Sequence, residues 1–189
     1  MVNFLTVLET GMKVKRPIDD MLIVEIADGS QQALHELYDS VSASVYGFVL
    51  SITKNSHDAE DVLQETFLTV FEKASDYKPS GKPMAWIFTI AKNHALSKLR
   101  SHSKLHLIDE EKSQLEDAFD NIDNLEQRLV IEASFKVLSD DERQILMLHA
   151  LSGMKHREIA AVLEMPINTV LSKYHRAIKK MRTELSQEV

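Results

Sequence analysis

Hydrophobic residues recur at helical spacing through most of the first half of the chain, which predicts an amphipathic bundle. A short helix opens at Pro17 and closes at Gly29, and a long one carries an apolar face from Leu34 to Ile52. A third helix follows Ser56, a favourable N-cap, and a fourth begins at Pro83, after the loop 75–82. The inner stripes of the last two are Ala59, Val62, Leu63, Phe67, Val70 and Phe71, and then Trp86, Ile87, Ile90, Ala91 and Leu99.

The second half continues with helices of the same kind. Residues 125–138 are helical in pattern, and Ser139 with Glu142 forms a capping box for a helix that Gly153 ends. Residues 155–182 predict two helices with a tight turn at Glu164-Met165-Pro166, because proline disfavours helix in the residue before it. Asn168 is the expected N-cap of the last helix. Its buried face is predicted to hold Val170, Tyr174, Ala177 and Met181.

The opposite face of the last helix is polar and cationic, as in a helix that enters the DNA major groove. A solvated face of an ordinary helical hairpin is the alternative, but small Ala160 and the ten-residue step to Val170 match helix-turn-helix packing, and we predict DNA binding. The predicted DNA-facing residues are Asn168, Thr169, Ser172, His175, Arg176 and Lys179, with Lys173 and Lys180 on the flanks.

The amino-acid composition also favours a helical protein. The 189 residues are 44% hydrophobic and include only five Gly and four Pro, so we expect an all-α protein of two small helical domains, residues 17–105 and 125–187. The absence of Cys excludes disulfides and thiolate metal sites. No stretch resembles a signal peptide or a membrane span, and we expect a cytoplasmic protein.

The net charge of −7 is unevenly distributed. Residues 106–135 hold two Lys/Arg against nine Asp/Glu, whereas the chain from 136 onward holds nine against seven. Residues 106–124 therefore predict an acidic linker, and the C-terminal block has the positive charge that nucleic-acid binding needs.

The sequence gives little support for a catalytic function. His57-Asp58 is the start of a metal phosphohydrolase signature, but a helix N-terminus explains it better. His149, His156 and His175 could converge from three neighbouring helices, yet no carboxylate or Cys stands at ligand spacing. Glycine-rich phosphate loops and nucleophile motifs are missing, so we predict no enzyme, no metal and no cofactor.

Two long blocks resemble a known family. DAEDVLQETFLTVFEKASDYKPSGKPMAWIFTIAKNHALSKLR, residues 58–100, resembles the second region of extracytoplasmic-function sigma factors of bacterial RNA polymerase. LSDDERQILMLHALSGMKHREIAAVLEMPINTVLSKYHRAIKKMR, residues 138–182, resembles their fourth region. Such a protein joins core polymerase, recognises promoter DNA, and is commonly held by an anti-sigma factor.

The resemblance implies a role for each group of residues. The helix from residue 58 would dock on core polymerase through Asp58, Asp61, Gln64 and Glu65, its exposed groups. The loop 75–82 and the next helix would hold the opened −10 element. The last helix would read the −35 element through the DNA-facing residues named above. The −10 residues are Tyr77, Lys78, Lys82, Lys92, Asn93 and Arg100.

The chain departs from the family pattern at four places, one of which is the basic run after Leu99, RSHSK rather than a chain of Arg. Glu164 stands where the turn usually has Gly, and a non-Gly residue in a left-handed position costs about 1 kcal/mol. Leu171 replaces a usual Lys and Ser97 a usual Asp. The alternative function is an autonomous helix-turn-helix regulator, which would bind its operator without polymerase.

Overall fold

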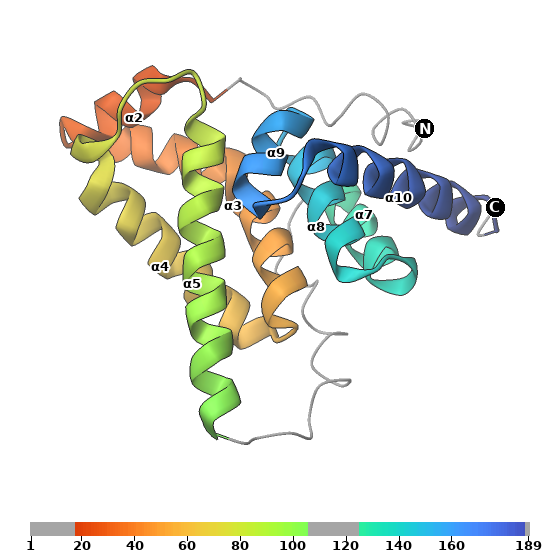
Figure 1. Ribbon diagram of the computed structural model, residues 1–189. Helices are drawn as coiled ribbons and strands as arrows, with labels where there is room; N and C mark the ends of the chain where they lie inside the picture. The colour runs from red at the N-terminus through yellow and green to blue at the C-terminus, as the bar shows by residue number, and fades with distance from the viewer. Residues whose placement is uncertain (1–17, 106–124, 188–189) are drawn as a thin grey trace.

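The computed structural model describes residues 18–105 and 125–187, and within these ranges every regular element is helical (Figure 1). The all-α prediction is confirmed. The predicted linker 106–124 lies outside the described residues. The elements are α2 (Asp20–Ala27), α3 (Gln31–Thr53), α4 (Ser56–Lys73), the 3-10 turn η1 (Ala74–Asp76), α5 (Pro83–Leu105), α7 (Leu125–Val137), α8 (Asp140–Leu146), the π-helical turn η2 (Met147–Leu151), α9 (His156–Leu163) and α10 (Ile167–Gln187).

Local signals set the helix ends. The Asp19 side chain accepts a hydrogen bond from the backbone N–H of Leu22, and Asn55 accepts one from Asp58, so Asn55 rather than Ser56 is the N-cap of α4. The capping box of Ser139 and Glu142 is present as predicted. Pro166, not Asn168, immediately precedes α10.

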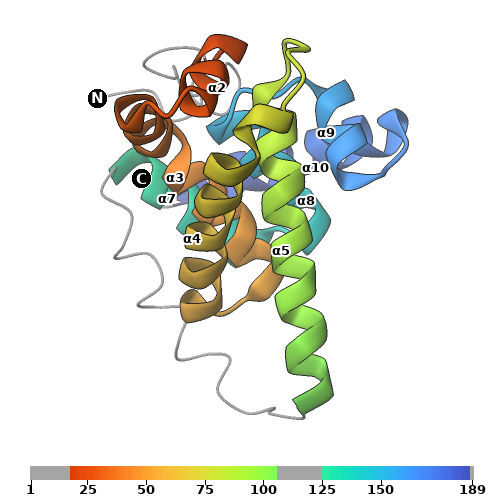
Figure 2. The same ribbon diagram turned by 90° about the vertical axis from the view of Figure 1, so that its left-hand side faces the viewer.

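The centre of the fold is the second half of α3, in which ten consecutive residues, 44–53, are buried. A helix buried on every side must be covered by neighbours on every side. Helices α4 and α5 cover one side of α3, while α7, α8 and η2 contact another (Figures 1 and 2). The two predicted domains therefore pack against each other along α3 rather than standing apart.

Two predicted core residues are instead exposed. Phe71 in the last turn of α4 is 45% exposed, and Leu99 in α5 is 46% exposed. The lower part of α5 extends past the helices that cover its upper part (Figure 2). Leu99 continues the apolar spacing of α5 into this part and is therefore exposed. Among the described residues, none of the helices combines the length and apolarity that a membrane crossing requires.

Candidate functional site

Helices α9 and α10 form the predicted helix-turn-helix. Glu164 has φ 56° and ψ 39°, a left-handed conformation, and the Met165 N–H donates to the carbonyl of Ala160 at 3.0 Å. The turn thus keeps the left-handed residue that the family usually supplies as glycine. Val170, Tyr174, Ala177 and Met181 are buried, so the predicted inner face of α10 is confirmed.

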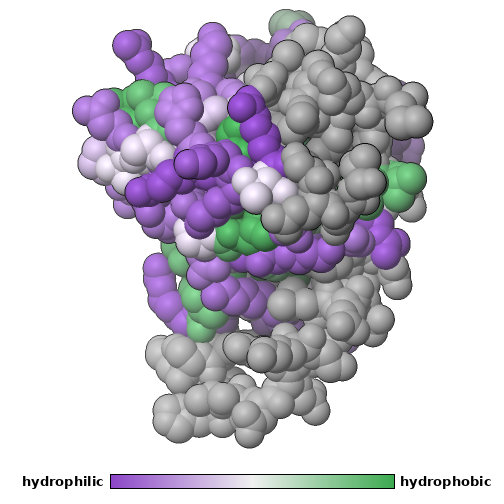
Figure 3. Space-filling view, turned by 90° about the vertical axis from the view of Figure 1, so that its right-hand side faces the viewer, coloured by the Kyte–Doolittle hydropathy of each residue, from purple (hydrophilic) through white to green (hydrophobic). Residues whose placement is uncertain are grey.

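The outer face of α10 divides into an exposed strip and a flank held by α8, and Arg176 belongs to both, because its side chain is exposed and yet lies near Glu142. Asn168, Ser172, His175, Arg176 and Lys179 are exposed, and Thr169 is half-buried. The described surface on the side of the molecule where α10 ends is mainly hydrophilic (Figure 3). This strip is the part of the helix that a DNA groove could cover.

The flank of α10 is paired with acidic residues of α8. Lys173 Nζ lies 2.8 Å from Asp141, Lys180 Nζ lies 2.6 Å from Glu142, and Arg176 Nε lies 3.6 Å from Glu142. Burial raises the pKa of Glu142, but hydrogen bonds from Lys180 and Ser139 outweigh it, and the net effect is a lowered pKa. Glu142 is therefore ionised and positions two of the predicted DNA contacts.

The loop 75–82 is held by hydrogen bonds to Asp20, a residue that the sequence analysis did not single out. Asp20 of α2 accepts a hydrogen bond from the Tyr77 hydroxyl with one oxygen and one from the Gly81 N–H with the other, at 2.7 Å. Burial and the Asp20 carboxylate both raise the pKa of Tyr77. The Tyr77 ring lies 5.0 Å from that of Trp86, between centroids. Only the spatial contact reveals Asp20, whose position in the sequence indicates nothing beyond a helix start.

The predicted −10 residues differ in accessibility. Lys78, Lys82, Asn93 and Arg100 are exposed. Lys92 is only 9% exposed, and its Nζ lies 2.6 Å from Glu164 Oε1 in the helix-turn-helix turn. A nucleic acid cannot reach Lys92 in this arrangement.

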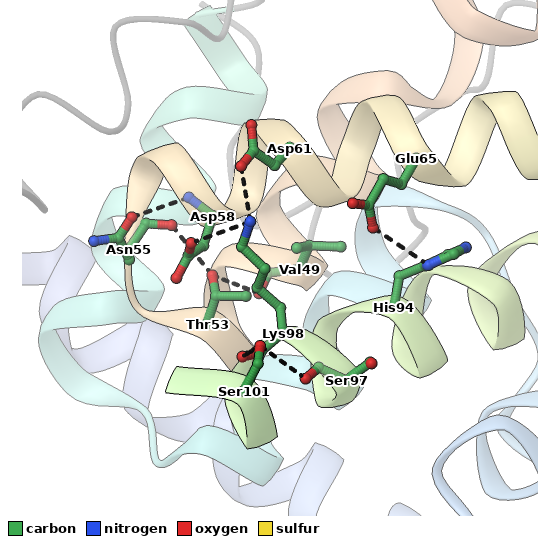
Figure 4. Close-up of polar contacts among 10 residues, drawn as sticks. All are labelled: Val49, Thr53, Asn55, Asp58, Asp61, Glu65, His94, Ser97, Lys98 and Ser101. Atoms are coloured by element: carbon green, nitrogen blue, oxygen red, sulfur yellow. Dashed lines mark hydrogen bonds and ion pairs between the residues drawn. The ribbon is translucent and has the colours of Figure 1, made fainter. Parts of the chain in front are cut away.

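The predicted polymerase-docking face of α4 requires one correction. Asp58, expected to be exposed, is 9% exposed and lies 3.7 Å from Lys98 of α5 (Figure 4). The same Nζ lies 2.8 Å from Asp61. This hydrogen bond lowers the pKa of Asp61 and raises that of Lys98. Asp58 is buried because α5 packs on the first turn of α4, a contact that the sequence period of α4 alone does not encode.

Other residues of that face lie outward. Gln64 and Glu65 are exposed, with Glu65 3.4 Å from His94 Nδ1 (Figure 4). Leu68, which the sequence analysis did not single out, is 62% exposed one turn beyond Gln64. Gln64, Leu68 and Phe71 thus form an exposed, partly apolar stripe on α4.

Of the three histidines that could converge according to the sequence, His149 and His156 are in direct contact. The rings of His149 and His156 stack with centroids 4.5 Å apart, and Tyr174 meets each edge-on at 4.7 Å. Burial, followed by the nearby His149 and His175, lowers the pKa of His156. Among the described residues, no three His, Cys, Asp or Glu side chains gather as a metal site. The cluster packs η2, α9 and α10 together.

Comparison with known proteins covers both halves of the chain. Residues 37–105 match the family described as Sigma-70 region 2, and residues 128–181 match Sigma-70, region 4. Both spans lie within the predicted domains, whose exact bounds stay predictions. The chain is 27% identical over 171 residues to the ECF RNA polymerase sigma factor SigK of Mycobacterium bovis, covering 86% of this chain and 91% of SigK. It is 28% identical over 181 residues to SigK of Mycobacterium ulcerans, covering 87% and 92%.

Solved structures share the fold. CnrH, in complex with the cytosolic domain of CnrY, superposes with a TM-score of 0.60 at 23% identity, covering 90% of this chain and 99% of that one. RpoE of Bartonella quintana, in complex with the anti-sigma factor NepR, gives a TM-score of 0.58 at 21% identity, covering 80% and 96%. With regions 2 and 4 both matched in that order, the chain belongs to the sigma-70 family, as an extracytoplasmic-function (ECF) RNA polymerase sigma factor.

Proposed function

We propose that this protein joins core RNA polymerase and directs it to promoters, using region 2 for the core enzyme and the −10 element and region 4 for the −35 element. The observation that carries the proposal is the presence of both sigma-70 regions on one chain, with an exposed polar and cationic strip on the recognition helix α10. The protein brings core polymerase to the promoter and catalyses no reaction itself. Its place of action is the cytoplasm, where polymerase works.

Docking on the core enzyme is assigned to the outer face of α4. Asp61, Gln64 and Glu65 supply polar contacts, and the exposed Leu68 supplies apolar area at the centre of the stripe. Asp58, being buried, contributes by holding α4 to α5. Asp61→Ala with Gln64→Ala should weaken co-elution with core polymerase while the helical circular dichroism is retained. Asp58→Asn is a matched comparison that should lower stability more than affinity.

Promoter contacts are divided between two surfaces. Lys78, Lys82 and Arg100 supply positive charge for the opened −10 strand, and Asn93 supplies a hydrogen-bonding amide. The exposed strip of α10 meets the −35 duplex, where Ser172 and Arg176, one helical turn apart, face the groove floor. The flanking Lys173 and Lys180 contact phosphates, which gives affinity without sequence information.

Control by an anti-sigma factor is part of the proposal. CnrH and RpoE, which share this fold, were both solved in complex with a partner, and NepR is described as an anti-sigma factor. We expect a comparable partner for this protein. A pull-down from cells that recovers only polymerase subunits under every tested stress would argue against one.

The decisive experiment mixes the purified protein with core polymerase and measures transcription from the promoter of its own gene. Transcription that depends on both components supports the sigma function. Sequence-specific binding to the same promoter without polymerase, and no effect on transcription when core enzyme is added, would favour the autonomous regulator instead.

A further inference from the structure

The loop 75–82 lies beside the first turn of α2, and one side chain of that turn binds it at two points (Figures 1 and 2). One oxygen of Asp20 accepts a hydrogen bond from the Tyr77 hydroxyl, and the other accepts one from the Gly81 N–H at 2.7 Å. The two donors stand 57 and 61 residues from Asp20 in the chain. A single carboxylate of α2 therefore fixes both ends of the span 77–81.

Asp20 is presented by a helix that is itself firmly placed. Leu22, Ile23 and Ile26 bury one side of α2 in the core. The helix contacts α3, α4 and η1, and the Asp19 side chain caps its first turn. A group on a packed helix is held more precisely than a group on a loop. The position of α2 therefore determines where the two Asp20 oxygens lie, and through them the conformation of the loop.

The span between the two bound residues is open to solvent. Its exposed residues are Lys78, Pro79, Ser80 and Gly81. Gly81 has φ 69°, and among the described residues no atom beyond its chain neighbours lies within 4 Å of a Cβ built there. An exposed span of this kind samples many conformations, and fixing each of its residues costs entropy. The two Asp20 hydrogen bonds restrict the span before any ligand arrives.

The Tyr77 hydroxyl is occupied by the same carboxylate. A phenol has one proton to donate, and Asp20 accepts it. The Tyr77 ring packs against Trp86 with centroids 5.0 Å apart, and the residue is half-buried, so part of it stays accessible. While the Asp20 bond persists, the hydroxyl cannot donate to a base edge. What the loop offers an unpaired base is the ring, and stacking on a ring tolerates every base.

Electrostatic attraction to DNA does not explain a carboxylate at this place. Lys78 and Lys82 are exposed and attract the phosphates of a strand, whereas a carboxylate bound to the same loop repels them. Asp20 thus lowers the electrostatic affinity of the loop for DNA. Its two hydrogen bonds supply the compensating effect, which is order in the loop.

We propose that Asp20 is a positioning residue for capture of the −10 strand, which sets the loop 75–82 in its binding conformation before DNA arrives. The Tyr77 hydroxyl is the anchor of the loop and reads no base. A loop that is ordered in advance loses less entropy on binding, so affinity rises without a new contact to DNA. The capture role rests on the proposed sigma function, whereas the hold of Asp20 on the loop does not. Helix α2 thus takes part in promoter opening without touching the promoter.

The first experiment measures the loop without polymerase. Trp86 is the only tryptophan of the chain, so its emission reports on the contact with Tyr77. Asp20→Ala should increase acrylamide quenching of this emission and shift it to longer wavelength, because Tyr77 is no longer held beside the indole. Ile26→Val removes a buried methyl group from α2 and lowers Tm without removing a hydrogen bond from the loop, and it should keep the quenching of the parent. Equal quenching in the parent and Asp20→Ala would overturn the hold on the loop.

The second experiment measures strand capture by the holoenzyme. The probe is a single strand that carries the −10 element of the promoter of the protein's own gene. Asp20→Ala should weaken binding of this strand by about tenfold, and Asp20→Asn, which keeps one accepting oxygen, by about threefold. Binding of core polymerase and of a −35 duplex should not change. Removal of a carboxylate by itself strengthens binding to DNA, and Glu25→Gln, at an exposed position of α2, measures that effect.

A double-mutant cycle tests the role assigned to the hydroxyl. Tyr77→Phe should weaken strand binding by about threefold in the parent. In the Asp20→Ala background it should cause no further loss, because the same hydrogen bond is already absent. An equal loss in both backgrounds would mean that the hydroxyl reads a base, and would overturn its role as an anchor.

The remaining outcomes separate the positioning role from the sigma function. Strand binding that is unchanged or tighter in Asp20→Ala would overturn the positioning role while the sigma function stands. A parent holoenzyme that forms but does not bind the strand would overturn the assignment of the loop to the −10 element. A parent protein that does not join core polymerase would overturn the sigma function itself. In both of these cases the Trp86 emission still decides whether Asp20 holds the loop.

Discussion

Lys98 should be a structural cation whose removal destabilises region 2. Its Nζ lies 2.8 Å from Asp61 and 3.7 Å from Asp58, and the Asp58 side chain is only 12% exposed (Figure 4). Lys98→Met keeps the aliphatic packing and leaves the buried Asp58 without this cation. Loss of the cation beside a largely buried carboxylate costs about 1–3 kcal/mol, and we expect a loss of free energy of unfolding in that range.

Thermal and urea unfolding followed by circular dichroism measure the loss, which corresponds to a decrease in Tm of about 2–12 °C for a chain of this size. Lys73→Met, which removes an exposed lysine at the end of α4, is the matched control and should change stability by less than about 0.5 kcal/mol. If Lys98→Met unfolds at the same urea concentration as the parent, the pair does not hold α4 to α5.

The pH dependence of the same variant provides a second check. Lys98 lowers the pKa of Asp61 from its usual 3.8, so this part of the stability is present above that pH. It is lost as the pH falls through the lowered pKa. The parent and Lys98→Met should therefore converge in stability in strong acid, and a difference that stays constant there would contradict the electrostatic explanation.

Three further predictions concern the promoter surfaces and region 4. Tyr77→Ala should leave duplex binding by the holoenzyme nearly intact but reduce permanganate reactivity of −10 thymines, since base stacking contributes roughly 1–3 kcal/mol. Asp20→Asn, which loosens the same loop, should reduce the permanganate reactivity less. Unchanged reactivity in both variants would place strand capture elsewhere. Arg176→Ala should flatten preference at one or two −35 positions, whereas Lys180→Ala should weaken all variants evenly and reduce the salt slope by about one. Equal losses for every −35 variant with Arg176→Ala would make Arg176 a backbone contact. Because burial lowers the pKa of His156 from 6.5, its neutral form stabilises region 4 fully above that pH, and the contribution is lost as the pH falls below it. His156→Phe should flatten the decline in Tm between about pH 7 and 5, and an unchanged decline would assign it to other groups.

The amino-acid sequence by itself determines the helices and the inner face of α10. Helical periodicity, caps and breakers act within a few residues, so Ser139 with Glu142 and the stripe from Val170 to Met181 can be recognised without knowing what lies opposite. The strip of polar and cationic residues on the outside of α10 follows from the same periodicity.

The tertiary structure alone decides which of these polar groups are available. Asp58 is buried by Lys98, Tyr77 is bound by Asp20, and Lys92 is covered by Glu164, pairs separated by 40, 57 and 72 residues. The spacing of residues along one helix sets which face a side chain occupies, but not which distant helix covers that face. Ion pairs form wherever packing brings opposite charges together, and the packing of α3 against both regions is a property of the whole chain.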